Sequence, residues 1–267
     1  MTDVDVLEKV AQLLKNRKKV ALCTVIEKRG SGPRDVGAKI AVSEDGEIVG
    51  TIGGGNLERT LVEEALKALK VGKSKKIIFS LREGAERRDA VKTGLICGGE
   101  ITIFIDVIEP KPHLIIIGSG HVGYPLAKLA DILGFEIVIV DDNKGLATRE
   151  RFPMAKEILV GDFTEILDKV EVRPDDFVVI VHGEPKHDFM ALKKMLEREV
   201  RYVGLLGSKV KVAKFKERLK KEGVSEDALR NLYAPVGLDI GAQTPEEIGI
   251  SILAQIIRIR RKMNKIS

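Results

Sequence analysis

The chain has 267 residues and few of the features that are typical of secreted or membrane proteins. It has two cysteines, Cys23 and Cys97, which are too few for a disulfide framework or for a zinc site with four ligands. No apolar run reaches the ~18 residues that a membrane-spanning helix needs. The acidic first five residues lack the basic and then apolar pattern of a signal peptide. We therefore expect a cytoplasmic protein with no membrane partner.

Aromatic residues are also scarce, at 4% of the chain, and tryptophan is absent. The net charge is +5, but lysine and arginine alternate with acidic residues, as in residues 214–218. Such mixing is typical of solvated helix faces, and binding of single-stranded nucleic acid relies on aromatic side chains for stacking. We expect no nucleic-acid partner.

The composition, with 44% hydrophobic and 32% charged residues, is that of a globular protein, and the length favours two domains. Two prolines, Pro110 and Pro112, stand between two apolar runs and interrupt strand pairing. We therefore predict one domain over residues 1–110 and a second over residues 111–267.

The first predicted domain mixes helices with strands. Its two helices show apolar residues at helical spacing, and Asp45-Gly46 marks a hairpin turn between two of its strands. This pattern predicts a smaller α+β domain with helices at 4–15 and 57–70 and strands at 20–26, 38–42, 47–52, 76–81 and 101–107.

After the prolines, apolar strands alternate regularly with helices, which indicates a parallel sheet with helices on both faces. Before the last helix, Thr244, Pro245 and Glu247 form the pattern of a capping box with proline at the first helical position. We predict an α/β fold of the Rossmann type, with strands at 113–117, 136–140, 157–160, 177–181 and 202–206 and helices at 122–133, 163–170, 188–199, 210–222 and 245–263.

The first of these strands leads directly into a glycine-rich turn and then a helix. In this G-x-G-x-x-G pattern Gly118 permits the tight turn, Gly120 lets a pyrophosphate approach the backbone, and Gly123 lets the helix pack on the strand. The free N–H groups at the helix start favour an anion. The alternative is that the glycines serve packing alone. We expect a nucleotide-like ligand to be bound by Gly118, Ser119, Gly120, His121, Val122 and Gly123.

The second strand ends in Asp141-Asp142, ~20 residues after the glycine turn, where a carboxylate would bind the ribose hydroxyls of a nucleotide. Two adjacent carboxylates would also disfavour a ribose that carries a 2′-phosphate. We therefore include Asp141 and Asp142 among the expected cofactor-binding residues.

Three further loops should reach the same edge of the sheet. His182 follows the fourth strand and would orient a ligand or transfer protons, or else be bonded within its loop. Asp188 fits a helix cap. Gly207 and Ser208 open the next helix as a second turn suited to anions, and Asp239 stands between two glycine turns as a candidate ligand contact.

The first domain has its own glycine-rich segments, at residues 30–37, 53–55 and 97–99. Arg34 beside such a turn suits a phosphate or a carboxylate. Cys97 precedes two glycines, so its thiol is either accessible or that of a small buried residue, whereas Cys23 lies inside an apolar strand. Glu58 complements the dipole of its helix.

Together these segments resemble one family, the xanthine dehydrogenase accessory proteins of the XdhC/CoxI type. The resemblance rests on GSGPRDVGAK, GTIGGGNLE, CGGEITIFIDVIEP, IIIGSGHVG, VIVDDN, YVGLLGSK and PVGLDIGAQTPEEIGISILAQI. It implies a two-domain protein that binds the molybdenum cofactor, assists its sulfuration and inserts it into a molybdenum hydroxylase. Its implied partners are that client enzyme and a cysteine desulfurase as sulfur donor.

Asn56 stands where many relatives carry cysteine, which argues against a mechanism with two thiols. Cys97 matches its segment, and we expect it to be the catalytic and metal-binding thiol, since thiolates suit a metal–sulfur centre. Gly118–Gly123 and Arg34 would hold the phosphate of molybdopterin. The alternative function is that of an NAD(P)-dependent oxidoreductase, and a third is a scaffold without a ligand. The residues leave the oligomeric state open, a homodimer included.

Overall fold

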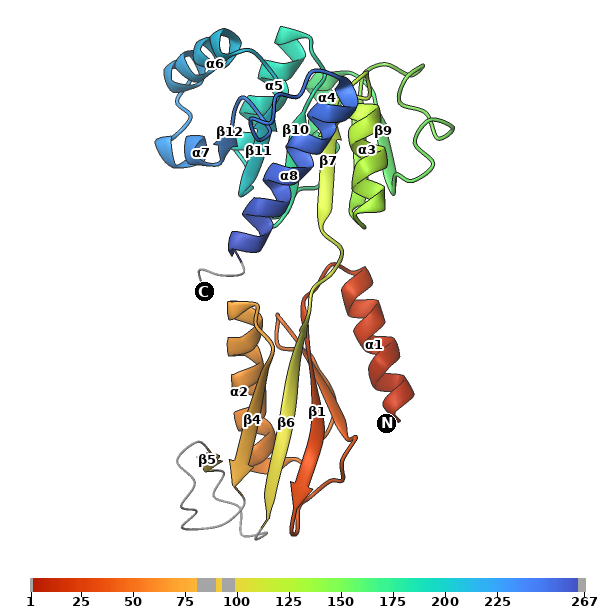
Figure 1. Ribbon diagram of the computed structural model, residues 1–267, viewed down its shortest axis with the longest axis vertical. Helices are drawn as coiled ribbons and strands as arrows, with labels where there is room; N and C mark the ends of the chain where they lie inside the picture. Colours follow the sequence, from red (N-terminus) through yellow and green to blue (C-terminus); the bar gives the residue numbers. More distant parts are fainter. Residues whose placement is uncertain (1, 81–89, 93–98, 264–267) are drawn as a thin grey trace. The chain divides into compact units, whose positions relative to one another are not determined.

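The computed structural model describes residues 2–80, 90–92 and 99–263. The chain forms two compact units, the first mainly from Met1–Pro110 and the second from Lys111–Lys262, and each is built on a six-stranded sheet (Figure 1). Among the described residues, no helix combines the length and the hydropathy needed to cross a membrane.

The sheet of the first unit has the order β3-β2-β1-β6-β4-β5. Its neighbouring strands are antiparallel, except that β4 and β5 run parallel. All the elements predicted for this unit are present, and β5 is additional. The elements are α1 (Asp3–Lys15), β1 (Val20–Arg29), β2 (Lys39–Ser43), β3 (Ile48–Gly50), α2 (Gly55–Val71), β4 (Lys75–Ser80), β5 (Ala90–Lys92) and β6 (Glu100–Ile108).

Alternate residues of β1 face the two helices of this unit. Ala21, Cys23 and Val25 pack in the core that contains the apolar side chains of α2, while Val20 packs in the core that contains those of α1. This alternation is what a two-residue strand period predicts. The helices therefore cover opposite faces of the sheet (Figure 1).

The sheet of the second unit is parallel throughout, with the order β12-β11-β10-β7-β8-β9. Counted from β7, this is the Rossmann order 3-2-1-4-5-6, whose direction reverses between β7 and β10. The strands are β7 (His113–Ile117), β8 (Glu136–Asp141), β9 (Glu157–Val160), β10 (Phe177–Ile180), β11 (Tyr202–Leu205) and β12 (Leu232–Tyr233).

Helices cover both faces of this sheet, which confirms the predicted fold class. Ile115 and Ile117 face a core with α4, α5 and α6, while Leu114 and Ile116 face a core with α3 and α8. The helices are α3 (Gly123–Ile132), α4 (Phe163–Lys169), α5 (Pro185–Leu196), α6 (Lys209–Lys221), α7 (Glu226–Arg230) and α8 (Pro245–Met263).

Three details of this unit differ from the prediction. Helix α5 begins at Pro185 rather than at Asp188, because proline fits the first turn of a helix. The two-residue strand β12 and the five-residue helix α7 were not predicted, since neither is long enough to show a periodic pattern.

Candidate functional site

The glycine-rich loop after β7 lies at the point where the strand order reverses. A Cβ on Gly118 would lie 2.4 Å from the backbone nitrogen of His182, and its φ of +114° favours glycine. A Cβ on Gly123 would lie 1.9 Å from the carbonyl oxygen of Gly118. A Cβ on Gly120 would have no atom within 4 Å. Packing thus requires the outer two glycines, while the middle one faces open space.

Asp141 holds this loop from the end of β8. Its Oδ2 accepts hydrogen bonds from the backbone nitrogen of Ser119 at 2.5 Å and from the Ser119 hydroxyl at 2.7 Å. Its Oδ1 accepts one from the nitrogen of Asn143 at 2.8 Å, and the residue is 2% exposed. Asp141 therefore already has three donors within the protein, and its contact with a ribose stays a prediction.

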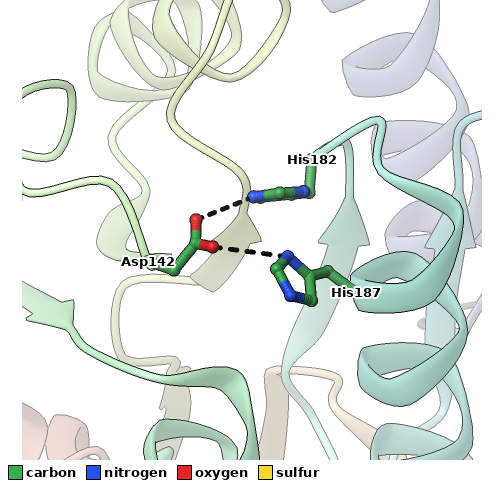
Figure 2. A group of neighbouring side chains, drawn as sticks. All are labelled: Asp142, His182 and His187. Atoms are coloured by element: carbon green, nitrogen blue, oxygen red, sulfur yellow. Dashed lines mark hydrogen bonds and ion pairs between the residues drawn. The ribbon is translucent and has the colours of Figure 1, made fainter.

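Asp142 points instead toward two histidines, as Figure 2 shows. Its Oδ1 lies 3.0 Å from Nε2 of His182, which follows β10, and its Oδ2 lies 3.4 Å from Nδ1 of His187, in the first turn of α5. Glu184 Oε2 lies 3.1 Å from the same His187 nitrogen. The carboxyl ends of β8 and β10 thus bring four polar side chains together.

The Asp142 carboxylate is partly buried in this cluster. Burial alone would raise its pKa, but the interactions with His182, Asp141 and His187 together hold the pKa below its usual value. Asp142 therefore stays ionised at neutral pH and can accept hydrogen bonds or bind a cation.

His187 was not singled out from the sequence. The available signal was its position five residues after His182, directly beyond a buried strand whose carboxyl end lies at the ligand-binding edge. His187 lies in the first turn of α5, which begins at Pro185. The helix was predicted to begin at Asp188, one residue after His187, so His187 fell in the predicted loop and was not associated with the site.

Helices α5 and α6 are joined by an ion pair whose carboxylate is buried and whose lysine is half-buried. Asp188 is fully buried, accepts a hydrogen bond from the nitrogen of Gly183 at 3.3 Å, and pairs with Lys211 Nζ. Asp188 is thus not the N-cap of α5, a position that Glu184 occupies. Ser208 caps α6 by accepting from the nitrogen of Lys211 at 3.2 Å.

The segment before α8 is fixed by side chains of that helix. The amide of Gln255 bonds both the nitrogen and the oxygen of Gly237, at 3.2 and 3.0 Å. The predicted capping box is confirmed, because the nitrogen of Thr244 donates to Glu247 Oε2 at 3.0 Å and the nitrogen of Glu247 donates to Thr244 Oγ1 at 3.3 Å. Asp239 is exposed.

The remaining residues predicted at this edge differ in exposure. His121 is exposed, Val122 is half-buried, and Gly207 lies against the stem of Lys211, where a Cβ would be 3.0 Å from Cδ. Their contact with a ligand stays a prediction.

In the first unit the glycine segments approach one another closely. A Cβ on Gly53 would lie 2.4 Å from Cβ of Pro33, and a Cβ on Gly99 would lie 2.0 Å from the carbonyl oxygen of Ser31. Segments 30–37 and 53–55 therefore meet, and Gly99 joins them. Cys97, predicted as the catalytic and metal-binding thiol, lies outside the described residues.

Glu58 holds one of these loops together. Its Oε2 accepts from the Thr51 hydroxyl at 2.6 Å and from the nitrogens of Ile52 and Gly54 at 3.2 and 3.1 Å. Its role thus goes beyond complementing the helix dipole. Arg34 is exposed in this unit.

The fold and loops define a two-unit α/β protein with a Rossmann-type second unit. The description "XdhC Rossmann domain" matches residues 114–256, and "XdhC and CoxI family" matches residues 13–81. The chain belongs to the XdhC and CoxI family.

Two bacterial proteins resemble more than half of the chain. It is 38% identical to the uncharacterized protein YqeB of Escherichia coli K12 over 96% of the chain, and 34% identical to a probable xanthine dehydrogenase component of Bacillus subtilis over 60%. It spans 46% and 47% of those two proteins, about half their length.

Two further proteins resemble this chain over most of its length and over most of their own length. The molybdenum cofactor insertion chaperone PaoD of E. coli is 23% identical over 96% of this chain and 88% of its own length. A crystal structure described as a xanthine dehydrogenase from Bacillus halodurans superposes with a TM-score of 0.53 and 28% identity, and covers 98% of this chain and 96% of that one.

Proposed function

We propose that this chain is an accessory protein that binds the molybdenum cofactor and assists its sulfuration and its insertion into a molybdenum hydroxylase. The observation that carries the proposal is the similarity to a molybdenum cofactor insertion chaperone along nearly the whole of both chains. Membership of the XdhC and CoxI family supports the same role.

The phosphate end of molybdopterin fits the loop after β7. The backbone at Gly120 borders open space, and the start of α3 presents N–H groups suited to an anion. Residues Gly118–Gly123 would hold the phosphate, and Arg34 in the first unit is a separate candidate for binding an anionic group. The cofactor supplies the molybdenum centre on which the client enzyme depends. The chain's own part is to bind this group and release it.

The decisive measurement is mass spectrometry of the ligand released from the full-length protein, produced in cells that make molybdopterin. We expect molybdopterin or its nucleotide form in the wild type and much less in the Gly120→Val variant, purified in the same way. Protein from cells unable to make molybdopterin is the control. A wild-type protein that retains NAD(P) alone would contradict the proposal.

An NAD(P)-dependent oxidoreductase is the second candidate, because Asp141 ends β8 and Asp142 follows it, where a dinucleotide ribose would lie. Turnover of a nicotinamide cofactor by the purified protein distinguishes it from the accessory function. The accessory function predicts no such turnover.

A further inference from the structure

We propose that Asp142, His182 and His187 form a binding site for one divalent transition-metal ion, with zinc as the best match. One donor atom from each residue lies within 4.8 Å of the other two (Figure 2). The three donors come from separate places in the chain, namely the end of β8, the end of β10 and the first turn of α5.

The donor set is that of a first-row metal rather than of magnesium or calcium. Imidazole nitrogen and carboxylate oxygen bind zinc at about 2.0–2.2 Å, so ligand atoms around a tetrahedral ion stand roughly 3.4 Å apart. Asp142 Oδ1 lies 3.0 Å from His182 Nε2, and Asp142 Oδ2 lies 3.4 Å from His187 Nδ1, so each imidazole nitrogen stands near this separation from a different oxygen of the same carboxylate. Small side-chain rotations would complete the geometry.

A fourth ligand stands next to the cluster. Glu184 Oε2 lies 3.1 Å from Nδ1 of His187, and the Glu184 side chain is 52% exposed, so it can turn toward an ion. Two imidazoles and two carboxylates would complete a tetrahedral site. If Glu184 stays in solvent, the fourth position is open to water or to a ligand.

The two imidazoles are already held in place by one buried ring. Phe163 stacks on His187 with a centroid distance of 4.6 Å and an interplanar angle of 4°, and meets His182 edge to face at 5.0 Å. Phe163 is itself 2% exposed. Side chains fixed in this way lose little freedom when a metal binds.

Nδ1 of His187 gives a second reason to expect an ion. This atom is closed off from solvent and makes no hydrogen bond within the described part of the chain. The Glu184 and Asp142 oxygens lie 3.1 and 3.4 Å from it without the geometry of a hydrogen bond. Metal coordination would satisfy this nitrogen.

The proposed metal site lies beside the glycine-rich loop after β7. His182 Nε2 is 3.8 Å from Asp141 Oδ1, and the other oxygen of Asp141 bonds Ser119 of that loop. A bound cation would offset the negative charge of Asp141 and Asp142 where an anionic ligand is expected to approach. This inference concerns a resident ion and does not depend on which ligand the loop takes.

The test uses untagged full-length protein, made without molybdopterin and stripped with a chelator. Zinc chloride is titrated calorimetrically, and cobalt(II) chloride is followed by its visible absorption. We expect one ion per chain. His182→Gln and His187→Gln should each weaken binding at least about tenfold, and Asp142→Asn should do so while keeping the side-chain size.

Asp131→Asn is the matched control for Asp142→Asn, because it removes an exposed carboxylate in the last turn of α3, outside the cluster, and should bind zinc like the wild type. Melting temperatures of all variants show that each is folded. The proposal fails if the wild type binds no ion, or if folded His182→Gln, His187→Gln and Asp142→Asn keep the wild-type affinity. Because no molybdopterin is present, either result leaves the proposed accessory function to its own test.

Discussion

At the scale of single residues, the three glycines of the loop after β7 have different surroundings. A Cβ added at Gly118 or Gly123 would lie within 2.5 Å of backbone atoms, whereas one added at Gly120 would face open space. A substitution at the outer positions therefore changes the fold, while one at Gly120 changes what can approach the loop.

We predict that Gly120→Val abolishes binding of nucleotide or molybdopterin with little change in melting temperature. The valine side chain would occupy the space that a phosphate needs. Calorimetric titration should show a loss of at least about tenfold in affinity. Gly123→Ala is the contrasting variant, because its Cβ would collide with the carbonyl oxygen of Gly118 and should lower the melting temperature. Equal ligand affinities of wild type and Gly120→Val would remove the phosphate role from this loop.

Cys23 provides a second prediction at this scale. Its side chain is fully buried in the core beneath α2, and burial raises the pKa of its thiol to about 12. The thiol therefore stays protonated at neutral pH and should resist iodoacetamide in the folded protein. Mass spectrometry should find Cys23 alkylated only after denaturation. Labelling of Cys23 in the native protein at a rate typical of exposed thiols would contradict this.

The sequence indicated the place of the site better than the roles of its residues. Asp141 and Asp142 were predicted together, since both follow a buried strand. Successive side chains of a strand point to opposite sides, so one carboxylate bonds Ser119 and the other faces His182. Whether Asp141 or Asp142 bonds Ser119 depends on the loop packed beside the strand. The order of residues in the sequence does not contain that information.

At the scale of elements, periodic segments were predicted well, while two very short strands were missed. Strand β7 was predicted with the bounds that the structure has, because it is uniformly apolar and ends in a glycine turn. Strands β5 and β12 have three and two residues, too few for any period to show. Their pairing is decided by the neighbouring strand rather than by local sequence.

An ion-pair cluster between α2 and β4 yields a prediction of pH dependence. Glu64 lies 2.7 Å from Lys67 and 2.5 Å from Lys75, and hydrogen bonds from these lysines lower the pKa of its carboxyl below 4.5. A lowered pKa adds stability above pH 4.5, and this stability is lost as the pH falls through the folded-state value.

Glu64→Gln should accordingly reduce the free energy of unfolding by up to about 1 kcal/mol at pH 7. The difference from wild type should shrink as the pH drops below 4.5. Urea unfolding at several pH values measures it. Glu63→Gln is the matched control, because Glu63 is exposed on the same helix. A difference that persists unchanged into acid would show that packing, not charge, explains the loss.

The contact of α8 with the preceding segment gives another prediction. Gln255 Oε1 accepts a hydrogen bond from the hydroxyl of the fully buried Tyr202 at 2.7 Å and another from Gly237. Gln255→Ala would leave these donors without their acceptor, which costs about 1–3 kcal/mol. Thermal unfolding should show the loss, while Gln243→Ala, on the exposed part of the segment, should not. If the Gln255→Ala variant melts at the same temperature as the wild type, this prediction is contradicted.

At the scale of the whole molecule, each unit contributes a group of loops whose chemistry the sequence indicated. The glycine segments of the first unit meet at Pro33 and Ser31, and the second unit gathers polar side chains at the carboxyl ends of β8 and β10. The convergence of each group depends on strand pairing between distant parts of the chain. No local pattern reveals such pairing, which is why His187 and Glu58 were not recognised as parts of these groups.

The two cysteines allow the proposed function to be tested in the complete protein. We predict that Cys97→Ser impairs activation of a molybdenum hydroxylase client, because a thiolate binds soft metals and accepts sulfur, whereas a hydroxyl does neither well. Cys23→Ser should mainly lower the melting temperature, since it places a hydroxyl in an apolar core.

The measurement is client activity after incubation with each full-length variant and the molybdenum cofactor, with the melting temperature recorded alongside. A loss of at least about tenfold is expected for Cys97→Ser at an unchanged melting temperature, against near wild-type activation by the folded Cys23→Ser protein. If Cys97→Ser activates the client as well as the wild type does, the thiol has no part in the reaction. The accessory role would then rest on phosphate binding alone, and Gly120→Val should be the variant that abolishes activation.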